Sequence, residues 1–195
     1  LYINIDNYRL RVFSNVDKLT GIYTRKYYES EFNKILMEAK RKEESFAVLM
    51  LDLDGFKEIN DTYGHRTGDE ILSIIGRILK KSIRSTDLVA RYGGEEFIII
   101  LRNVLEDEAK TIAEKIRQNI EDIRLPAIEK AVTISTGISM FPIHSQFKEE
   151  LIEKADQALY CAKERGKNRV IMWDTNLADT LNRGDRLAGI ISGNT

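Results

Sequence analysis

The order of hydrophobic and polar positions predicts alternating helices and strands. Apolar side chains recur at helical spacing over 25–44, and a continuous apolar run of strand length, FAVLMLDL, occupies 46–53. A second helical stripe runs from Ile71 to Leu79, in a helix that ends around 82–85. The pattern therefore opens with a helix, a buried strand and a second helix.

Two short strands are predicted next, at 87–92 and 95–101, on either side of Gly93-Gly94. Two adjacent glycines can supply the positive φ angles of a tight hairpin turn. We therefore expect these strands to be neighbours in one sheet.

The remaining periodic segments complete the fold. They are a helix over 106–121, an alternating strand over 131–140, a helix over 148–165 and a short strand over 169–173. The core order βαββαβ predicts an α/β (α+β) fold of the ferredoxin-like or palm-like kind. We expect a central antiparallel sheet, with the flanking helices packed on one face.

Length and composition indicate one domain with two tails. A chain of 195 residues that is 43% hydrophobic and 31% charged can bury one core and does not require two. We expect a linker or the end of an upstream signalling helix over 1–16, the domain over 17–173, and a tail over 174–195 that leads to a possible further domain.

Charge and cysteine content limit the expected ligands and the expected cellular compartment. The net charge of −1 offers no overall field for nucleic acid or an anionic membrane, so any phosphate binding must be local. The single cysteine, Cys161, excludes an internal disulfide, and no apolar run approaches the ~20 residues of a membrane span. We expect a cytoplasmic domain cut from a longer protein, whose other parts could be membrane-anchored.

Carboxylates gather at two strand ends. Asp52 and Asp54 lie two residues apart at the end of the first buried strand, so they face the same way, and Glu95 opens a later strand. The first and third strands of a ferredoxin-like sheet are central neighbours, so these acids can converge. Converging acids need a cation between them, and hard oxygen ligands favour Mg²⁺ or Mn²⁺ with substrate phosphates.

A simpler interpretation of these acids stays open. Asp54 could cap the helix that starts at Gly55, since aspartate is a preferred N-cap residue. The glutamates could pair with lysines at a strand edge.

Four stretches of the chain resemble the GGDEF family of diguanylate cyclases. In chain order they are DKLTGIYTRKYY, LDLDGFKEINDTYGHRTGDEIL, RYGGEEF and AKERGKNRV, and the resemblance covers about 17–173. The spelling GGEEF differs from the family name by Glu for Asp at the third position, which keeps the carboxylate.

The resemblance implies the joining of two GTP molecules into cyclic di-GMP plus two pyrophosphates, with each 3′-hydroxyl attacking the α-phosphate of the other nucleotide. It implies Mg²⁺ or Mn²⁺ held by the side chains of Asp52 and Glu95 and by the backbone carbonyl of Leu53. Such metal ions lower the pKa of the attacking hydroxyl and neutralise phosphate charge. Glu96 would assist the metals from the turn or only shape the turn.

The resemblance also implies where the phosphates bind. A helix start presents free N–H groups and a positive dipole end to phosphates. The implied phosphate contacts are Gly55, Phe56, Lys57, Lys163 and Lys167.

Guanine recognition is implied for Asn60 and Asp69, with His65 near the same pocket. An aspartate accepts from guanine N1–H and N2–H₂ together, whereas adenine has no such donor pair. GTP is therefore expected over ATP.

Regulation and assembly also follow from the resemblance. Arg84 and Asp87 form an RxxD pattern separated by five residues from Gly93, as in product-inhibited members, where arginine forks onto a phosphate or guanine edge. One domain binds one GTP, so catalysis requires a homodimer, controlled by an upstream sensor domain whose identity the sequence does not give.

Two other functions stay open. The first is a catalytically weak GGDEF module that senses or binds cyclic di-GMP or GTP, and the second is a palm-like cyclase or polymerase that uses the same metals on ATP. Retention of the acids and of Asp69 favours the GTP-dependent enzyme.

Overall fold

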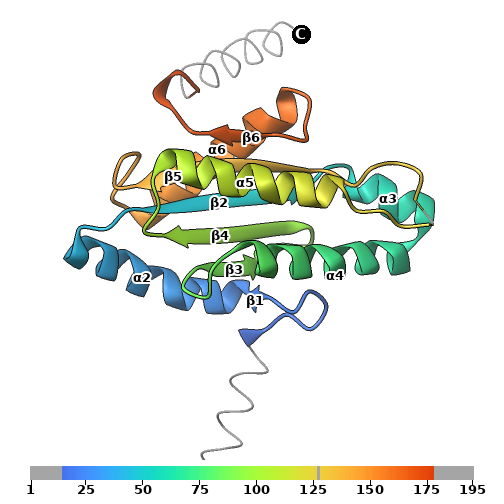
Figure 1. Cartoon of the computed structure of the whole chain (residues 1–195), viewed down its shortest axis with the longest axis horizontal. Coiled ribbons are helices and arrows are strands. Elements are labelled where there is room, and N and C mark those ends of the chain that lie inside the picture. The colour runs from blue at the N-terminus through green and yellow to red at the C-terminus, as the bar shows by residue number, and fades with distance from the viewer. Residues whose placement is uncertain (1–14, 127, 178–195) are drawn as a thin grey trace, which may run out of the picture.

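The computed structural model describes residues 15–126 and 128–177, and its elements alternate as the hydrophobic pattern predicts (Figure 1). The linker 1–14 and the tail 178–195 lie outside the described residues. The elements are β1 (Tyr23–Thr24), α2 (Arg25–Lys42), β2 (Phe46–Leu53), α3 (Phe56–Tyr63), α4 (His65–Ser82), β3 (Leu88–Arg91), β4 (Glu96–Arg102), α5 (Glu106–Glu121), β5 (Ile134–Phe141), α6 (Lys148–Glu164) and β6 (Val170–Met172).

The strands form one sheet in the order β1-β3-β4-β2-β5-β6. The four central strands are antiparallel neighbours, and β2 lies between β4 and β5. This arrangement confirms the ferredoxin-like order, including the adjacency of the first and third predicted strands. The short edge strands differ, because β1 runs parallel to β3 and β6 runs parallel to β5. The complete sheet is therefore mixed.

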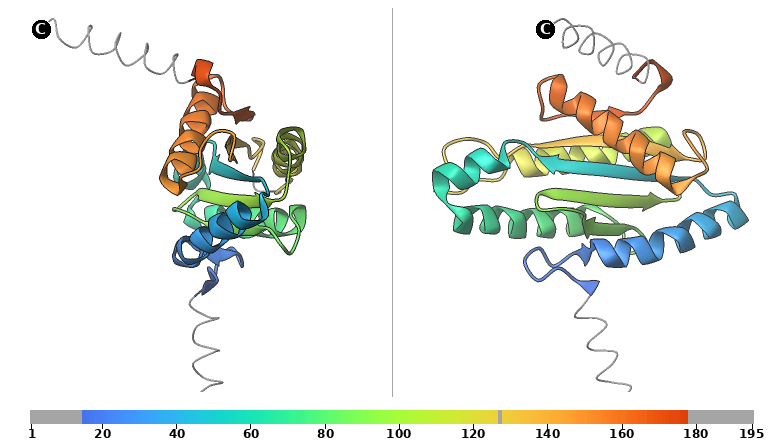
Figure 2. Two further views of the ribbon diagram at one scale, coloured as in Figure 1. Left: turned by 90° about the vertical axis from the view of Figure 1, so that its left-hand side faces the viewer. Right: turned by 180° about the vertical axis from the view of Figure 1, so that it is seen from behind.

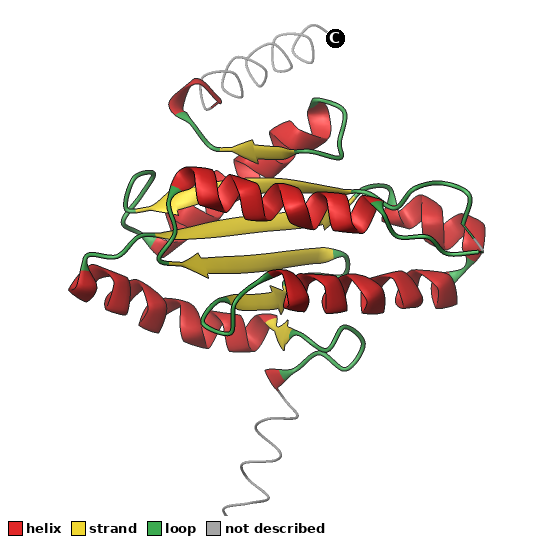
Figure 3. Cartoon of the chain, in the orientation of Figure 1, coloured by secondary structure: helices red, strands yellow, loops and turns green. Residues whose placement is uncertain are grey.

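Helices cover both faces of the sheet, so the expectation that they pack on one face is wrong (Figures 2 and 3). Val48 and Met50 of β2 face α2 and α6, whereas Leu49 and Leu51 face α4 and α5. All eight residues of β2 are buried. A strand that is apolar at every position exposes two hydrophobic faces and needs a layer on each.

Two helix boundaries differ from the pattern. The segment after Asp54 forms α3 and then α4, and Gly64 separates them with a φ of 81°. The second predicted helix therefore begins at His65, before its apolar stripe. The first turn of α4 is mostly polar and exposed, so the apolar pattern did not indicate it. None of the helices in the described ranges is long and apolar enough to cross a membrane.

Helix α6 approaches the sheet closely at a glycine. A Cβ atom added to Gly137 of β5 would lie 2.0 Å from the carbonyl oxygen of Ala155 and 2.2 Å from the amide nitrogen of Leu159. The missing side chain lets the backbone of α6 rest on β5. This close contact sets the distance between the sheet and α6, the helix that carries Lys163.

Candidate active site

Asp52 stands near the end of β2, on the face that α6 covers. Only 7% of the residue is exposed, and the Nζ atom of Lys163 lies 2.9 Å from its Oδ1 atom. Burial raises the pKa of Asp52, the hydrogen bond and charge of Lys163 lower it in part, and the charges of Asp54 and Asp156 raise it. The pKa of Asp52 is raised overall, so Lys163 does not fully offset the effects of burial and of the neighbouring carboxylates.

Glu95 lies in the turn before β4, next to the end of β2. The N–H of Leu53 donates to the carbonyl oxygen of Glu95 at 3.3 Å. Burial raises the pKa of Glu95, the negative charge of Asp52 raises it further, and Lys163 opposes both. The structure therefore brings two carboxylates together beside one lysine.

The backbone of Leu53 faces the same turn. In an extended strand the N–H and C=O of one residue point to the same side, and the N–H of Leu53 points at Glu95. Its carbonyl oxygen therefore also points toward the β4 side of β2.

The two glycines before Glu95 differ in how closely they are packed. Neither Gly93 nor Gly94 has a left-handed φ, so the expectation of positive φ angles in this turn is wrong. The carbonyl of Glu96 accepts from the N–H groups of Tyr92 and Gly93, at 2.8 and 3.2 Å, which closes the turn without that conformation. A Cβ atom on Gly93 would lie 2.2 Å from Oε2 of Glu96, whereas one on Gly94 would meet open space.

Glu96 begins β4 directly opposite Asp52 in the strand register. Residues opposite each other in an antiparallel pair share a face, so the side chain of Glu96 belongs to the Asp52 side of the sheet and lies over Gly93. It lines the turn.

Arg91 joins this turn to the start of the domain, a contact that the sequence did not predict. Its Nε and Nη2 atoms donate to the carbonyl of Gly94 at 3.1 and 2.7 Å, and its Nη1 atom lies 3.3 Å from Oδ1 of Asp17. Asp17 also accepts from the hydroxyl of Thr20 at 2.7 Å. The motifs DKLT and RYGGEEF are thus physically connected, but no periodic signal links positions so far apart.

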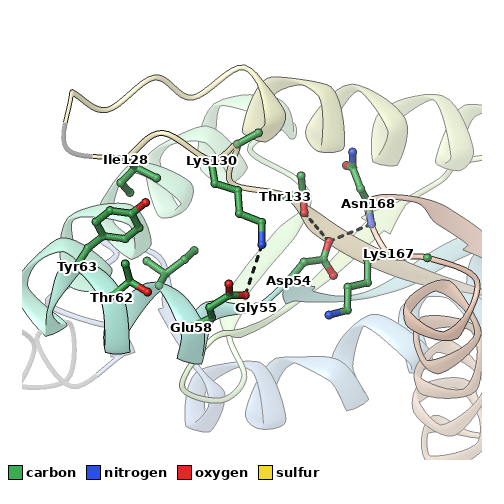
Figure 4. Close-up of a pocket in the computed structure, with 13 residues that line it drawn as sticks. Asp54, Gly55, Glu58, Thr62, Tyr63, Ile128, Lys130, Thr133, Lys167 and Asn168 are labelled. Atoms are coloured by element: carbon green, nitrogen blue, oxygen red, sulfur yellow. Dashed lines mark hydrogen bonds and ion pairs between the residues drawn. The ribbon is translucent and has the colours of Figure 1, made fainter.

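Asp54 does not cap the helix that follows it. Gly55 occupies the N-cap of α3 with a φ of 69°, and that cap has no side-chain hydrogen bond. The Asp54 carboxylate instead accepts from the hydroxyl of Thr133 at 2.9 Å and from the N–H of Asn168 at 3.0 Å (Figure 4). It also accepts from the hydroxyl of Ser135 at 2.7 Å. The interpretation of Asp54 as the N-cap of the following helix is therefore wrong.

The residues implied in phosphate binding surround the start of α3. Phe56 is buried, so only its backbone faces the site, whereas the side chain of Lys57 is exposed. Lys163 reaches in from α6, and the exposed Lys167 lies in the turn after it. A cavity of about 320 Å³ adjoins these residues and is lined by Gly55 and Lys167, with Lys130 and Glu58 paired at 3.4 Å across it (Figure 4).

Asn60 and Asp69 lie on the two helices α3 and α4. The Oδ1 atom of Asn60 is buried and has no hydrogen-bond partner among the described residues, and a Cβ atom on Gly68 would lie 2.0 Å from it. Asp69 and His65 are exposed on α4, one helical turn apart. A buried acceptor without a donor costs stability and is typical of an atom kept for a ligand.

Arg84 and Asp87 are placed at the turn between α4 and β3. Oδ2 of Asp87 accepts from the N–H of Arg84 at 2.9 Å, and its Oδ1 accepts from the N–H of Arg102 at 3.0 Å. The guanidinium of Arg84 pairs with Glu108 at 2.7 Å in an exposed ion pair. A cavity of about 420 Å³, lined by Arg84, Ser85 and Asp87 with Gly21–Tyr23 opposite, opens beside them.

The donor set fits a hard divalent cation bound together with its substrate. No group of three or more His, Cys, Asp or Glu side chains is arranged for a metal within 15–126 and 128–177. Mg²⁺ typically takes one or two protein carboxylates and completes its shell with waters and substrate phosphates. Asp52 and Glu95 supply that number, and the raised pKa values show that added positive charge would be stabilising.

Comparison with known proteins points to one family. Residues 14–169 match the family described as diguanylate cyclase, GGDEF domain. Diguanylate cyclase DosC of Escherichia coli is 43% identical over 165 residues, which are 83% of this chain and 36% of that protein. Diguanylate cyclase A of Treponema denticola is 38% identical over 184 residues, 90% of this chain and 48% of that protein. The chain thus spans less than half the length of these relatives.

Solved structures agree with the fold. The coiled coil and GGDEF domain of DgcB from Caulobacter crescentus, in complex with c-di-GMP, superposes with a TM-score of 0.82 at 29% identity, covering 88% of this chain and 92% of that one. The active GGEEF domain of a diguanylate cyclase from Vibrio cholerae gives a TM-score of 0.70 at 32% identity, covering 75% of this chain and 94% of that one.

Proposed function

The chain belongs to the GGDEF family of diguanylate cyclases, and from that membership we propose that it condenses two GTP molecules into cyclic di-GMP with release of two pyrophosphates. The observation that carries the proposal is the convergence of Asp52 and Glu95 at the end of β2 beside Lys163. Three charged groups of this kind serve phosphoryl chemistry, in which positioning and charge neutralisation provide most of the rate.

Asp52, Glu95 and the carbonyl of Leu53 would hold Mg²⁺ or Mn²⁺. When bound, that ion lowers the pKa of the attacking 3′-hydroxyl and neutralises charge on the phosphates. Glu96 would keep the turn in shape from its place over Gly93. Lys163 would hold positive charge between Asp52 and the incoming phosphates.

The nucleotide would lie along α3. The N–H groups of Gly55, Phe56 and Lys57 would donate to the terminal phosphates at the helix start, aided by Lys163 and Lys167. The base would reach the space between α3 and α4, where Asn60 Oδ1 lacks a donor and Asp69 and His65 are exposed. An exposed aspartate that accepts two guanine N–H donors would select GTP over ATP.

The test is product formation from GTP and Mg²⁺. We expect cyclic di-GMP from the wild-type chain, and we expect Glu95→Gln to lower the rate by about a hundredfold or more. Glu31→Gln, which removes a carboxylate from an exposed ion pair on α2, is the matched control and should keep the wild-type rate. Normal turnover in Glu95→Gln would exclude the metal assignment, and an ATP rate equal to the GTP rate would exclude the role of Asp69.

Binding of the product is a second candidate function, favoured by the cavity at Arg84 and Asp87. There Arg84 would exchange its exposed pairing with Glu108 for a phosphate or a guanine edge of cyclic di-GMP. In an active enzyme the result is product inhibition, and in a catalytically weak one it is a sensor. The site would lie at the far end of α4 from His65.

Calorimetry with cyclic di-GMP tests this site. Arg84→Ala should abolish binding there and relieve inhibition, whereas Arg41→Ala, an exposed arginine of α2, should change neither. Undiminished affinity in Arg84→Ala would remove the site. Absence of turnover together with tight product binding would favour the sensor over the enzyme.

A further inference from the structure

The turn after α6 has an unusual backbone. Gly166, Lys167 and Asn168 all have positive φ angles, of 108°, 62° and 47°. Glycine adopts this region freely and asparagine does so with little strain, but a lysine there costs about 1–2 kcal/mol. The turn therefore holds Lys167 in a conformation that its neighbours must maintain.

Asn168 is held on three sides. Its N–H donates to Oδ2 of Asp54 at 3.0 Å, and its Nδ2 donates to Oε1 of Glu121 at 2.8 Å. Its Oδ1 accepts from Nη1 of Arg117 at 2.8 Å. The backbone and both ends of the side chain are thus hydrogen-bonded, and the partners come from the end of β2 and from α5.

Arg117 is itself fixed in place. Its side chain is 13% exposed and pairs with Glu114 at 2.7 Å and with Glu121 at 2.6 Å, one turn away on each side of α5. Arginine offers a rigid fork of donors, so its direction toward Asn168 is determined by these two carboxylates. Helix α5 therefore presents a preorganised partner to the turn.

Asp54 connects the same turn to the metal-binding end of the sheet. It follows Asp52 by two residues and accepts hydrogen bonds from Thr133, just before β5 (Figure 4), and from Ser135 of β5. The link from α5 to the strand end therefore passes through Asn168. We call Asp54, Arg117, Glu121 and Asn168 the turn clamp.

We propose that the turn clamp positions Lys167 for the phosphates of GTP, with Asn168 as the central positioning residue. This inference rests on the proposed function. Lys163 needs no such support, because α6 carries it and Asp52 pairs with it at 2.9 Å. The clamp thus holds the backbone of Lys167 at a fixed position relative to Asp52, and it makes α5 a supporting element of the site.

The test separates positioning from general stability. Asn168→Gly keeps the left-handed conformation accessible and removes both side-chain hydrogen bonds. We expect about tenfold weaker binding of a non-reactive GTP analogue with Mg²⁺ by calorimetry, the scale typical for lost supporting contacts. In a Lys167→Ala background the same change should have no further effect, since the clamp acts through that lysine. The control is Arg124→Ala, whose guanidinium donates to the carbonyls of Glu121 and Ile123 and which should bind normally.

The possible results are distinguishable. Unchanged affinity in Asn168→Gly, or an equal loss with and without Lys167, would overturn the clamp while leaving the cyclase proposal intact. A wild-type chain that binds no GTP analogue would overturn both. If thermal unfolding shows that Asn168→Gly is not folded, Arg117→Lys replaces it, because one ammonium cannot reach Glu114, Glu121 and Asn168 together, and the same dependence on Lys167 is expected.

Discussion

Asp52, Asp54 and Glu95 lie at or beside the ends of two neighbouring strands, and each has a different environment. Asp52 is buried beside one lysine, Asp54 is fully hydrogen-bonded within the fold, and Glu95 is half-buried next to Asp52. Burial is the first cause of the raised pKa values of both Asp52 and Glu95. Residue type and spacing alone therefore do not distinguish the roles of these three carboxylates, whereas their surroundings in the fold do.

Those raised values predict a pH dependence of metal binding. At the proposed metal site, protons would compete with Mg²⁺ for Asp52 and Glu95. Because folding raises the pKa of Asp52 above 3.8 and that of Glu95 above 4.5, this competition would begin at a higher pH than for free carboxylates. We expect Mg²⁺ affinity, measured by calorimetry with a non-reactive GTP analogue, to fall as the pH is lowered from about 7 toward 5. Glu95→Gln should bind more weakly and with a smaller pH dependence. Equal slopes in both chains would contradict the involvement of Glu95.

The pKa of Asp17 is shifted in the opposite direction, and this shift predicts a pH dependence of folding stability. Burial alone would raise its pKa, but hydrogen bonds from Thr20 and the charge of Arg91 hold the pKa below 3.8. A lowered pKa in the folded state stabilises the fold above the unfolded value, and this contribution is lost as the pH falls through the folded value. Asp17→Asn should lower the free energy of unfolding at pH 7 by about 1–2 kcal/mol.

The measurement is urea unfolding at two pH values. The difference between wild type and Asp17→Asn should shrink below pH 3.8, where the wild-type carboxylate also becomes protonated. Lys18→Gln, at the exposed neighbouring position, is the control and should unfold like the wild type at both values. A difference that does not change with pH would show that the charge of Asp17 is not its source.

At the scale of elements, the position of α6 depends on one missing side chain. Gly137→Ala would place a methyl group 2.0 Å from a backbone oxygen of α6, which cannot rotate away as a flexible side chain can. We expect the free energy of unfolding to fall by about 1–3 kcal/mol, which is typical of overpacking. We also expect weaker binding of the GTP phosphates, because Lys163 moves with α6. Gly94→Ala meets open space and should stay within about 0.5 kcal/mol of wild type.

Element identity was largely predictable because the periods are clear. The run FAVLMLDL matches β2, and the stripe over 106–121 matches α5, residue for residue. The layer arrangement was predicted incorrectly, although a strand buried at all eight positions already implies cover on both faces. The turn at Gly93-Gly94 was also predicted incorrectly, since neither glycine has a positive φ and only a Cβ atom at Gly93 would meet a neighbour.

At the scale of the whole molecule, the site was only partly accessible from sequence. Strand order and side-chain alternation place Asp52 near Glu95, because both rules are local or topological. The partners of these residues follow no such rule. Arg117 and Asn168 are 51 positions apart, and Arg91 and Asp17 are 74 apart, so their contacts depend on how helices dock on the finished sheet.

Assembly of two copies predicts how activity depends on concentration. The proposed guanine site between α3 and α4 would hold one GTP per chain, so two GTP molecules would come from two chains, and a net charge of −1 gives little long-range steering between them. We expect the rate of cyclic di-GMP formation per chain to fall in proportion to dilution once the dimer dissociates. Fusing a dimeric coiled coil before residue 1 should remove this dependence, since tethering supplies an effective concentration on the order of millimolar. A monomeric fusion of similar size is the control. A rate per chain that stays constant while sedimentation shows monomers would mean that a single chain completes the reaction, and the homodimer would be rejected.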